Sequence, residues 1–218
     1  MKLTLALFVA VVCVAPTMFA SSLTWNFLND VPTSSTGVAV NSPHSFTDTQ
    51  GDTTTITASI LKSSANSTQL FEKKQGGDEF GLGIFDTNNN EIDTNSIVKL
   101  DLNNLLSLNP SFISITLESV QTGEGGSVHY GNTGNGFNVS DENSHNLDLT
   151  TLRADGGYIE IQATSNDVLV GNISASAITT QAPTPEPASY GLLGIGLLAT
   201  AVTVVQRRLR LQGAPGPR

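Results

Sequence analysis

The sequence predicts an all-β fold, an antiparallel β-sandwich or jelly-roll-like domain over residues 23–178, flanked by an N-terminal signal peptide and a single C-terminal transmembrane helix. Three observations predict this organisation. Apolar and polar residues alternate along several short segments of the middle region, as in strands with one buried and one wet face. Turn-rich segments of Gly, Asn and Asp separate these runs. An apolar run without charges lies near each end of the chain.

The strands are expected in sequence order between short turns. Residues 53–60 (TTTITASI) are rich in Thr and Ile, which favours a strand, and Trp25, the only Trp, is expected in the core. The side chains expected on the buried faces of later strands are Val98, Leu100 and Leu102; Ile113, Ile115 and Leu117; Ile159, Ile161 and Ala163; and Leu169, Gly171, Ile173, Ala175 and Ala177. The turns are expected at Gly76–Asp78, Asn88–Asn90, Gly123–Gly126, Gly131–Gly136 and Asp155–Gly157. The one helical candidate is the stretch 103–106, which Pro110 limits. Many short strands with this punctuation predict two packed sheets.

The N-terminal residues 1–22 have the pattern of a secretory signal peptide. Lys2 supplies a positive charge, residues 3–14 are apolar, and the small residues Ala20, Ser21 and Ser22 suit cleavage. Cleavage is expected after Ala20 or Ser22. Cys13, the only cysteine, is then removed with the leader, so we expect no disulfide and no thiol chemistry in the mature protein.

The C-terminal region reads as a linker, a membrane span and a basic tail. Residues 179–187 are rich in Pro and Thr, which predicts an extended, semi-rigid linker. Residues 188–205 carry no charge, and as a helix they would reach about 27 Å, close to the roughly 30 Å of a bilayer core. Arg207, Arg208 and Arg210 in the tail 206–218 indicate its cytoplasmic side. A buried core helix is the alternative, and arginines directly after the run argue against it.

The tripeptide Pro185, Glu186 and Pro187, followed by this span and the arginines, resembles the PEP-CTERM sorting signal of bacterial exported proteins. The resemblance implies that an exosortase, a membrane cysteine protease-like transpeptidase, recognises and cuts the tail. It also implies that the precursor is held in the inner membrane before the domain passes to the cell surface or extracellular matrix. The stretch 211–218 after the arginines is longer than this signal leads us to expect.

The middle region is similar to the β-sandwich ectodomains common among PEP-CTERM proteins. This resemblance implies a fold and no reaction. The segments that carry it are 46–47, 55–58, 81–83 leading to 91–93, 98–102, 158–163 and 167–173.

The exported region is strongly acidic. All nineteen Asp and Glu residues lie between Asp30 and Glu186, and only five cationic side chains oppose them there, for a net charge of −14. Such a surface argues against nucleic acid as a partner, because nucleic acid is bound by basic patches. The acidity either attracts divalent cations or serves only solvation.

A search for catalytic motifs predicts that the protein is not an enzyme. The sequence has no metalloprotease helix motif, phosphate loop or nucleophile elbow. Ser127 and His129 fall on one face of a strand, but that spacing alone does not orient a nucleophile and a base. His44, His129 and His145 are scattered, so we expect ordinary surface histidines more than a metal site formed by all three.

The segment 86–93 (DTNNNEID) is the best candidate for a bound ion, and no other cofactor is expected. Asp86, Asn88, Asn90 and Asp93 offer oxygen ligands of the kind that Ca²⁺ prefers. Glu91 stands at the sixth position, where a calcium loop needs glycine. An Asn-rich turn is the alternative, since Asn tolerates left-handed backbone angles.

Two classes of function follow. The first is a non-enzymatic surface or extracellular-matrix protein, sorted through its tail. The second is a carbohydrate- or calcium-dependent binding module on the cell surface, with extracellular polysaccharide as its partner. A sugar could stack on Tyr130, although packing of this ring against a sheet edge is the alternative.

Overall fold

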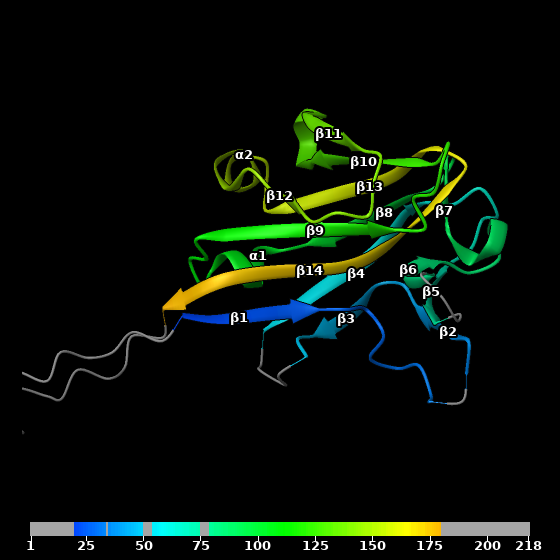
Figure 1. Cartoon of the computed structure of the whole chain (residues 1–218), viewed down its shortest axis with the longest axis horizontal. Coiled ribbons are helices and arrows are strands. Elements are labelled where there is room, and N and C mark those ends of the chain that lie inside the picture. The colour runs from blue at the N-terminus through cyan, green and yellow to red at the C-terminus, as the bar shows by residue number, and fades with distance from the viewer. Residues whose placement is uncertain (1–19, 34, 50–53, 75–78, 180–218) are drawn as a thin grey trace, which may run out of the picture. The chain divides into compact units, whose positions relative to one another are not determined.

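The computed structural model describes residues 20–33, 35–49, 54–74 and 79–179, coloured in Figure 1. The strands are β1 (Ala20–Trp25), β2 (Gly37–Asn41), β3 (His44–Thr47), β4 (Thr55–Lys62), β5 (Gln69–Lys74), β6 (Phe80–Ile84), β7 (Ile92–Asp93), β8 (Ile97–Asp101), β9 (Phe112–Glu118), β10 (Gly125–Tyr130), β11 (Gly136–Val139), β12 (His145–Asn146), β13 (Tyr158–Ser165) and β14 (Asp167–Thr179). The helices are α1 (Asn103–Leu106) and α2 (Leu149–Ala154), with 3₁₀ turns at Asn88–Asn90 and Gly131–Thr133.

These strands form two antiparallel sheets. The first has the order β12-β9-β14-β6-β5-β2, and β1 and β7 also pair with β14. The second has the order β11-β10-β13-β8-β4-β3. The prediction of an all-β, antiparallel, two-sheet fold is thus confirmed. The predicted signal peptide up to residue 19 and the predicted span 188–205 lie outside the described residues. Within the described ranges, no helix is long and apolar enough to cross a membrane.

The core contains apolar side chains from both sheets. Leu100 and Ile161 come from the second sheet, Leu82 and Ile115 from the first, and all four are fully buried in one cluster. Trp25 belongs to the same cluster, as the sequence predicted. The alternation of apolar residues along β8, β9 and β13 therefore identified their inward faces correctly.

The long strand β14 departs from the predicted pattern. The sequence placed Leu169, Gly171 and Ile173 on one buried face. All three are buried, but the core cluster contains Val168 and Val170 together with Ile173, and not Leu169. The reason is a β-bulge: the pairing of β14 with β9 shifts register between Val170 and Asn172. An extra residue in one strand exchanges its two faces from that point onward.

The helices are short and lie between strands. The predicted stretch 103–106 is α1, and Leu105 and Leu106 bury its apolar side. The prediction of a single helix is wrong, because α2 also forms. Asp148 caps α2 by accepting hydrogen bonds from the backbone N–H groups of Thr150 and Thr151. This N-cap, followed by Leu149 and Leu152 three residues apart, was the sequence signal for α2.

The chain enters and leaves the described domain at the same end. Ala20, the first residue of β1, pairs with Thr179, the last residue of β14, and Figure 1 shows the two strands side by side. Strand structure therefore extends a few residues beyond the predicted bounds 23 and 178. The other end of β14 pairs with β7 through Asp167 and Asp93. Thirteen residues of strand, at about 3.3 Å each, separate the two ends by about 40 Å.

Candidate functional site

The predicted calcium segment forms a tight turn at the end of the sandwich opposite the termini. Asp86, Asn89 and Asn90 all have positive φ angles, as expected for the Asn-rich turn. The side-chain oxygen of Asn90 accepts the backbone N–H of Asp86 at 3.1 Å. Asp86 is exposed, and the side chain of Asn88 lies outside the described residues.

Asp93, the last predicted ligand, is occupied by other contacts. One carboxylate oxygen accepts the hydroxyl of Ser64, and the other accepts the backbone N–H of Asn95 at 2.8 Å. Burial raises the pKa of Asp93, but the hydrogen bonds from Ser64, Ser96 and Asn95 outweigh burial and hold this pKa below its ordinary value of 3.8. Calcium binding at Asp86, Asn88, Asn90 and Asp93 stays a prediction, and binding would have to displace these internal hydrogen bonds.

The segment around Ser127, His129 and Tyr130 is part of a sheet. Ser127 Oγ donates to the carbonyl of Gln162 at 3.3 Å, and His129 Nδ1 lies 3.2 Å from the carbonyl of Gly134. Neither side chain is therefore oriented by the other as a nucleophile and base would be. Tyr130 is only 6% exposed, so it packs in the core and presents no open face to a sugar.

The three histidines lie on different strands. His44 begins β3 and His129 is in β10, and these strands are four positions apart in the second sheet, about 19 Å. His145 is in β12 of the other sheet, where it contacts Asp141 at 2.9 Å. The described histidines therefore do not gather into one site.

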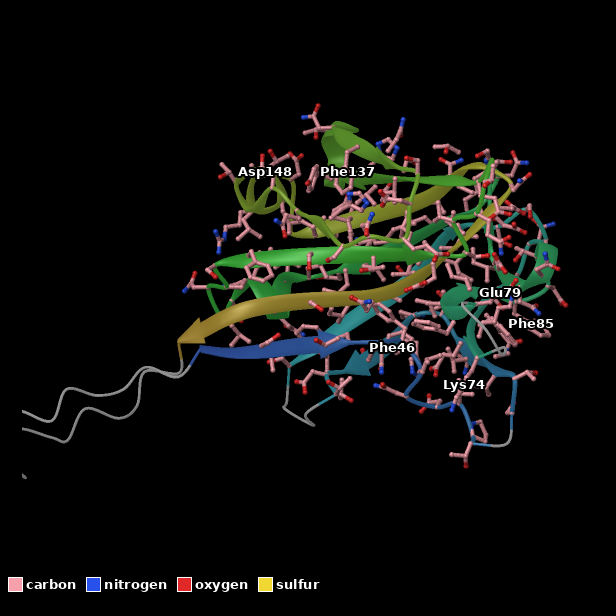
Figure 2. The ribbon with its side chains drawn as sticks, viewed as in Figure 1. Phe46, Lys74, Glu79, Phe85, Phe137 and Asp148 are labelled. Carbon is pink, nitrogen blue, oxygen red and sulfur yellow. The ribbon has the colours of Figure 1, made fainter. Side chains whose placement is uncertain are left out.

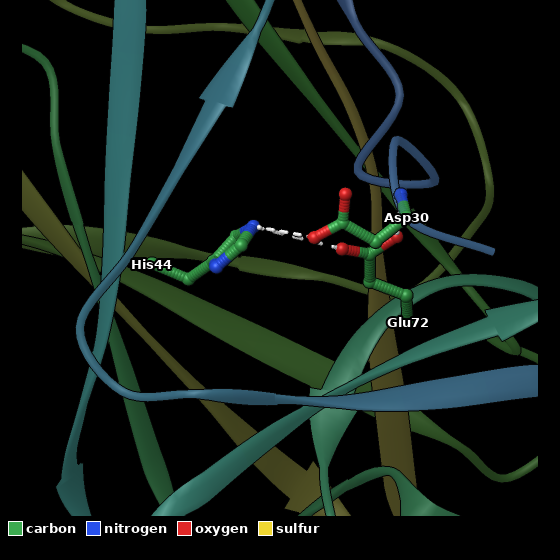
Figure 3. A group of neighbouring side chains, drawn as sticks. All are labelled: Asp30, His44 and Glu72. Atoms are coloured by element: carbon green, nitrogen blue, oxygen red, sulfur yellow. Dashed lines mark hydrogen bonds and ion pairs between the residues drawn. The ribbon is translucent and has the colours of Figure 1, made fainter.

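His44 instead meets two carboxylates, those of Asp30 and Glu72. Its Nε2 atom lies 3.2 Å from Asp30 Oδ2 and 3.9 Å from Glu72 Oε1. Figure 3 shows the three side chains pointing toward one another. Asp30 belongs to the connection between β1 and β2, His44 to β3 of the second sheet, and Glu72 to β5 of the first. The group thus connects β3, the edge strand of the second sheet, to β5, which lies one strand in from the edge of the first sheet.

The position of each side chain in this group follows from its surroundings. The ring of His44 packs edge-on against Phe46 with 4.7 Å between centroids, and Phe46 packs in the same way on Phe27 at 5.0 Å. The backbone N–H of Asp30 donates to Glu72 Oε2 at 2.9 Å. Imidazole and carboxylate are thereby fixed by a packed aromatic pair and a backbone hydrogen bond.

The environment of Glu72 disfavours its charge. Its side chain is 0% exposed, and burial raises its pKa to about 7. Hydrogen bonds from the backbone N–H groups of Asp30 and Val31 lower the pKa of Glu72, whereas the negative charge of Asp30 raises it further. The group thus places a buried carboxyl with a raised pKa beside an imidazole.

Sequence reasoning did not find this group, although it named His44. The three residues are separated by 14 and 28 positions and belong to three different elements. One signal was present: Glu72 alternates with Leu70 on the inward side of β5, which places a carboxylate at an apolar position. A charge at a core-facing position indicates a partner that only the tertiary structure brings near.

A second set of buried charges lies on the opposite face of β5. Lys73 Nζ contacts Glu79 at 2.9 Å and also contacts Glu91. Burial lowers the pKa of Lys73, but the hydrogen bonds that its ammonium group donates to Glu91 and Glu79 outweigh burial, so this pKa lies above its ordinary value of 10.5. Glu79 and Phe85 mark this end of the molecule in Figure 2. The ion pair between Lys73 and Glu91 connects the 86–93 turn to β5.

An open cavity of about 450 Å³ lies where the chain crosses from β4 to β5. Its lining is mostly polar, with hydroxyl and amide groups, and Leu61 is 51% exposed there. The lining residues are Ser42, Ile60, Leu61, Lys62, Ser63, Asn66, Ser67 and Thr68. Such a surface has hydrogen-bonding groups for a polar ligand, but no aromatic ring for a sugar to stack on.

Comparison with known proteins identifies the tail. Residues 183–208 match the model of the PEP-CTERM protein-sorting motif, a stretch that includes Pro185, Glu186 and Pro187 as well as Arg207 and Arg208. No curated protein and no solved structure matches the chain. The motif implies export, a membrane-anchored precursor and processing by an exosortase. The chain therefore carries a PEP-CTERM sorting motif at its C-terminal end, which indicates an exosortase-sorted surface protein.

Proposed function

We propose that the β-sandwich is a non-enzymatic domain of the cell surface or extracellular matrix, delivered there through its tail. The observation that carries the proposal is the sorting motif at residues 183–208, only a few residues after the end of β14. In this proposal the folded domain is the part that is exported, and the motif directs its sorting.

The position of the chain ends in the fold supports this role. Because Leu23 in β1 pairs with Ala175 near the end of β14, the leader and the sorting tail both join the domain at one end. The turns at the other end of the domain lie about 40 Å away along β14. In the proposed role, both chain ends attach at one end of the domain, and the turns at its other end are free of these attachments.

The proposed absence of enzymatic activity rests on the contacts of the candidate nucleophile. Ser127 Oγ donates to a backbone carbonyl, and His129 is hydrogen-bonded elsewhere. The net charge of −14 keeps such a domain soluble outside the cell and away from nucleic acid.

A binding module for extracellular polysaccharide is the second proposal. The cavity of about 450 Å³ beside Leu61 favours it, because the cavity combines hydroxyl and amide groups with the apolar side chains of Ile60 and Leu61. Binding of the full-length chain to a glycan array, with and without chelator, would separate this proposal from a purely structural role. Binding that chelator abolishes would indicate the calcium-dependent form.

The sorting step is tested in a bacterium that has an exosortase. Replacing Pro185, Glu186 and Pro187 by Ala should leave the precursor in the inner membrane with its tail uncut, which the C-terminal mass of the protein would show. The prolines keep this stretch extended, so a membrane protease can reach its backbone. Replacing Arg207, Arg208 and Arg210 by Ala should weaken retention instead.

Gln181→Ala is the matched control, since it alters the linker just before the matched stretch 183–208 and leaves the tripeptide unchanged. Normal processing of the tripeptide variant would show that the tripeptide is only a linker. A mature protein that still contains residues 192–205 would show that the tail is a permanent anchor. For the structural role, the mature domain is expected in the washed matrix or surface fraction, and a domain found only in the medium would contradict it.

A further inference from the structure

We propose that Asp30, His44 and Glu72 form a binding site for a divalent transition-metal ion of the first row, with zinc as the ion to test. The site would lie between β3 of the second sheet and β5 of the first, and would link the two sheets. This inference does not depend on the sorting tail or on the role proposed for the domain.

The spacing of the donor atoms fits a metal ion. The three ligand atoms lie within 4.8 Å of one another, one each from an imidazole and two carboxylates. Two ligands at about 2.1 Å from a tetrahedral zinc ion lie about 3.4 Å apart. The distances from His44 Nε2, 3.2 Å to Asp30 and 3.9 Å to Glu72, lie on either side of that value. Small side-chain movements therefore suffice to close the site.

Glu72 is the second, independent observation. Its carboxylate is fully buried, and within the described residues Oε1 accepts no hydrogen bond. The Asp30 N–H holds the other oxygen, Oε2, which turns Oε1 toward His44 and Asp30 (Figure 3). A buried carboxylate oxygen without a hydrogen bond is costly, so it needs a partner of opposite charge. A metal ion at this point would be that partner.

The charges of the group favour a doubly charged ion over a proton. An imidazolium would neutralise one carboxylate, whereas a divalent cation neutralises both. Such an ion would contact the buried carboxylate of Glu72 and the neighbouring carboxylate of Asp30 together.

The ligand types indicate which ions fit. Imidazole with carboxylates suits zinc and its neighbours in the first transition row, whereas calcium and magnesium prefer oxygen ligands alone. The Asp30 side chain is 51% exposed, so the solvent side of the group is open. Water can therefore occupy the remaining position of a four-coordinate ion.

The test uses the full-length chain in detergent, purified without a histidine tag and freed of metal by EDTA. Titration with zinc chloride in a calorimeter should show one ion per chain. Zinc at a hundredfold excess over its Kd should raise Tm by about 5–10 °C. Cobalt in place of zinc should give the visible absorption bands of a tetrahedral ion.

Three variants locate the site. H44Q and E72Q should each weaken zinc binding by more than about a hundredfold, because changes outside the direct ligands of a metal already cost about tenfold to a hundredfold. H145Q is the matched control: His145 also lies beside an exposed aspartate, Asp141 at 2.9 Å, but has no buried carboxylate. Zinc binding by H145Q should equal that of the wild type.

E72Q also separates a metal site from a structural contact. With EDTA present, E72Q should melt at or above the wild-type temperature, since it removes a buried charge that lacks a hydrogen bond. A lower Tm for E72Q together with unchanged zinc binding would show that Glu72 is a structural acceptor and overturn the proposal. Equal zinc binding by H44Q and H145Q, or no zinc binding by the wild type, would overturn it as well.

Discussion

The hydroxyl of Tyr130 accepts the backbone N–H of Asp148 at 2.8 Å, which connects the end of β10 to the beginning of α2. The Tyr130 ring lies 6.4 Å from that of Phe137 on β11. Asp148 and Phe137 are labelled in Figure 2. One side chain from the glycine-rich segment thus holds a helix against the second sheet.

Tyr130→Phe should remove this hydrogen bond and keep the packing. We expect a loss of about 1 kcal/mol in the free energy of unfolding, because the N–H of Asp148 loses its acceptor. For a domain of this size the loss corresponds to a fall in Tm of about 2–4 °C. Differential scanning calorimetry measures it, and an unchanged Tm would mean that water replaces the hydroxyl.

Ile115→Asp should abolish folding. Ile115 is fully buried in β9 opposite Ile173, and an unpaired carboxylate there faces the core of both sheets. The free energy of unfolding should fall by more than about 4 kcal/mol. Phe112→Asp on the same strand is the control, because Phe112 is 41% exposed. Circular dichroism should show strands for F112D and an unfolded chain for I115D.

Gly157→Ala should destabilise the domain more than Gly123→Ala. Both glycines have positive φ, so both substitutions strain the backbone. A Cβ on Gly157 would also lie 2.1 Å from Asn103 Oδ1, whereas a Cβ on Gly123 would meet nothing within 4 Å. We expect the free energy of unfolding to fall by about 1 kcal/mol in G123A and by at least twice that in G157A, as measured by urea unfolding. Equal losses would show that the Asn103 side chain moves aside freely.

Asp93 should make the domain less stable in acid. Its pKa in the folded protein lies below 3.8, so the stability it contributes is fully present above pH 3.8 and is lost as pH falls through the lower folded value. Asp93→Asn cannot ionise and should be less stable than the wild type at pH 6, with the difference shrinking below pH 3.8. Urea unfolding at several pH values measures it. Asp86→Asn, which removes an exposed charge from the same turn, is the control.

Calcium at millimolar concentration should not raise the Tm of the full-length chain. Asn90 and Asp93 already accept internal hydrogen bonds, which a calcium ion would have to replace. A clear rise that the double substitution Asp86→Ala and Asp93→Ala abolishes would contradict this expectation. It would favour the calcium-dependent binding module.

The sequence alone determined the features that depend on neighbouring residues. Val98 and Leu100 face the core as their alternation predicted, because side chains along a strand alternate with a period of two. The sorting motif was equally readable, since its recognition depends on residues that are consecutive in the chain. The helix at 103–106 also followed from local composition. The N-cap residue Asp148 is a local signal for α2 as well, but α2 was not predicted from it.

The tertiary structure decided what depends on pairing between distant segments. The bulge at Gly171 arises from the pairing of β14 with β9. The sequence of β14 alone therefore does not show where its inward-facing and outward-facing positions change over. The group of Asp30, His44 and Glu72 is assembled from a connection and two strands in different sheets, and its chemistry depends on the burial of Glu72. Periodicity reports which face of a strand turns inward; only the packing of the two sheets fixes which side chains then meet, and how far each is removed from water.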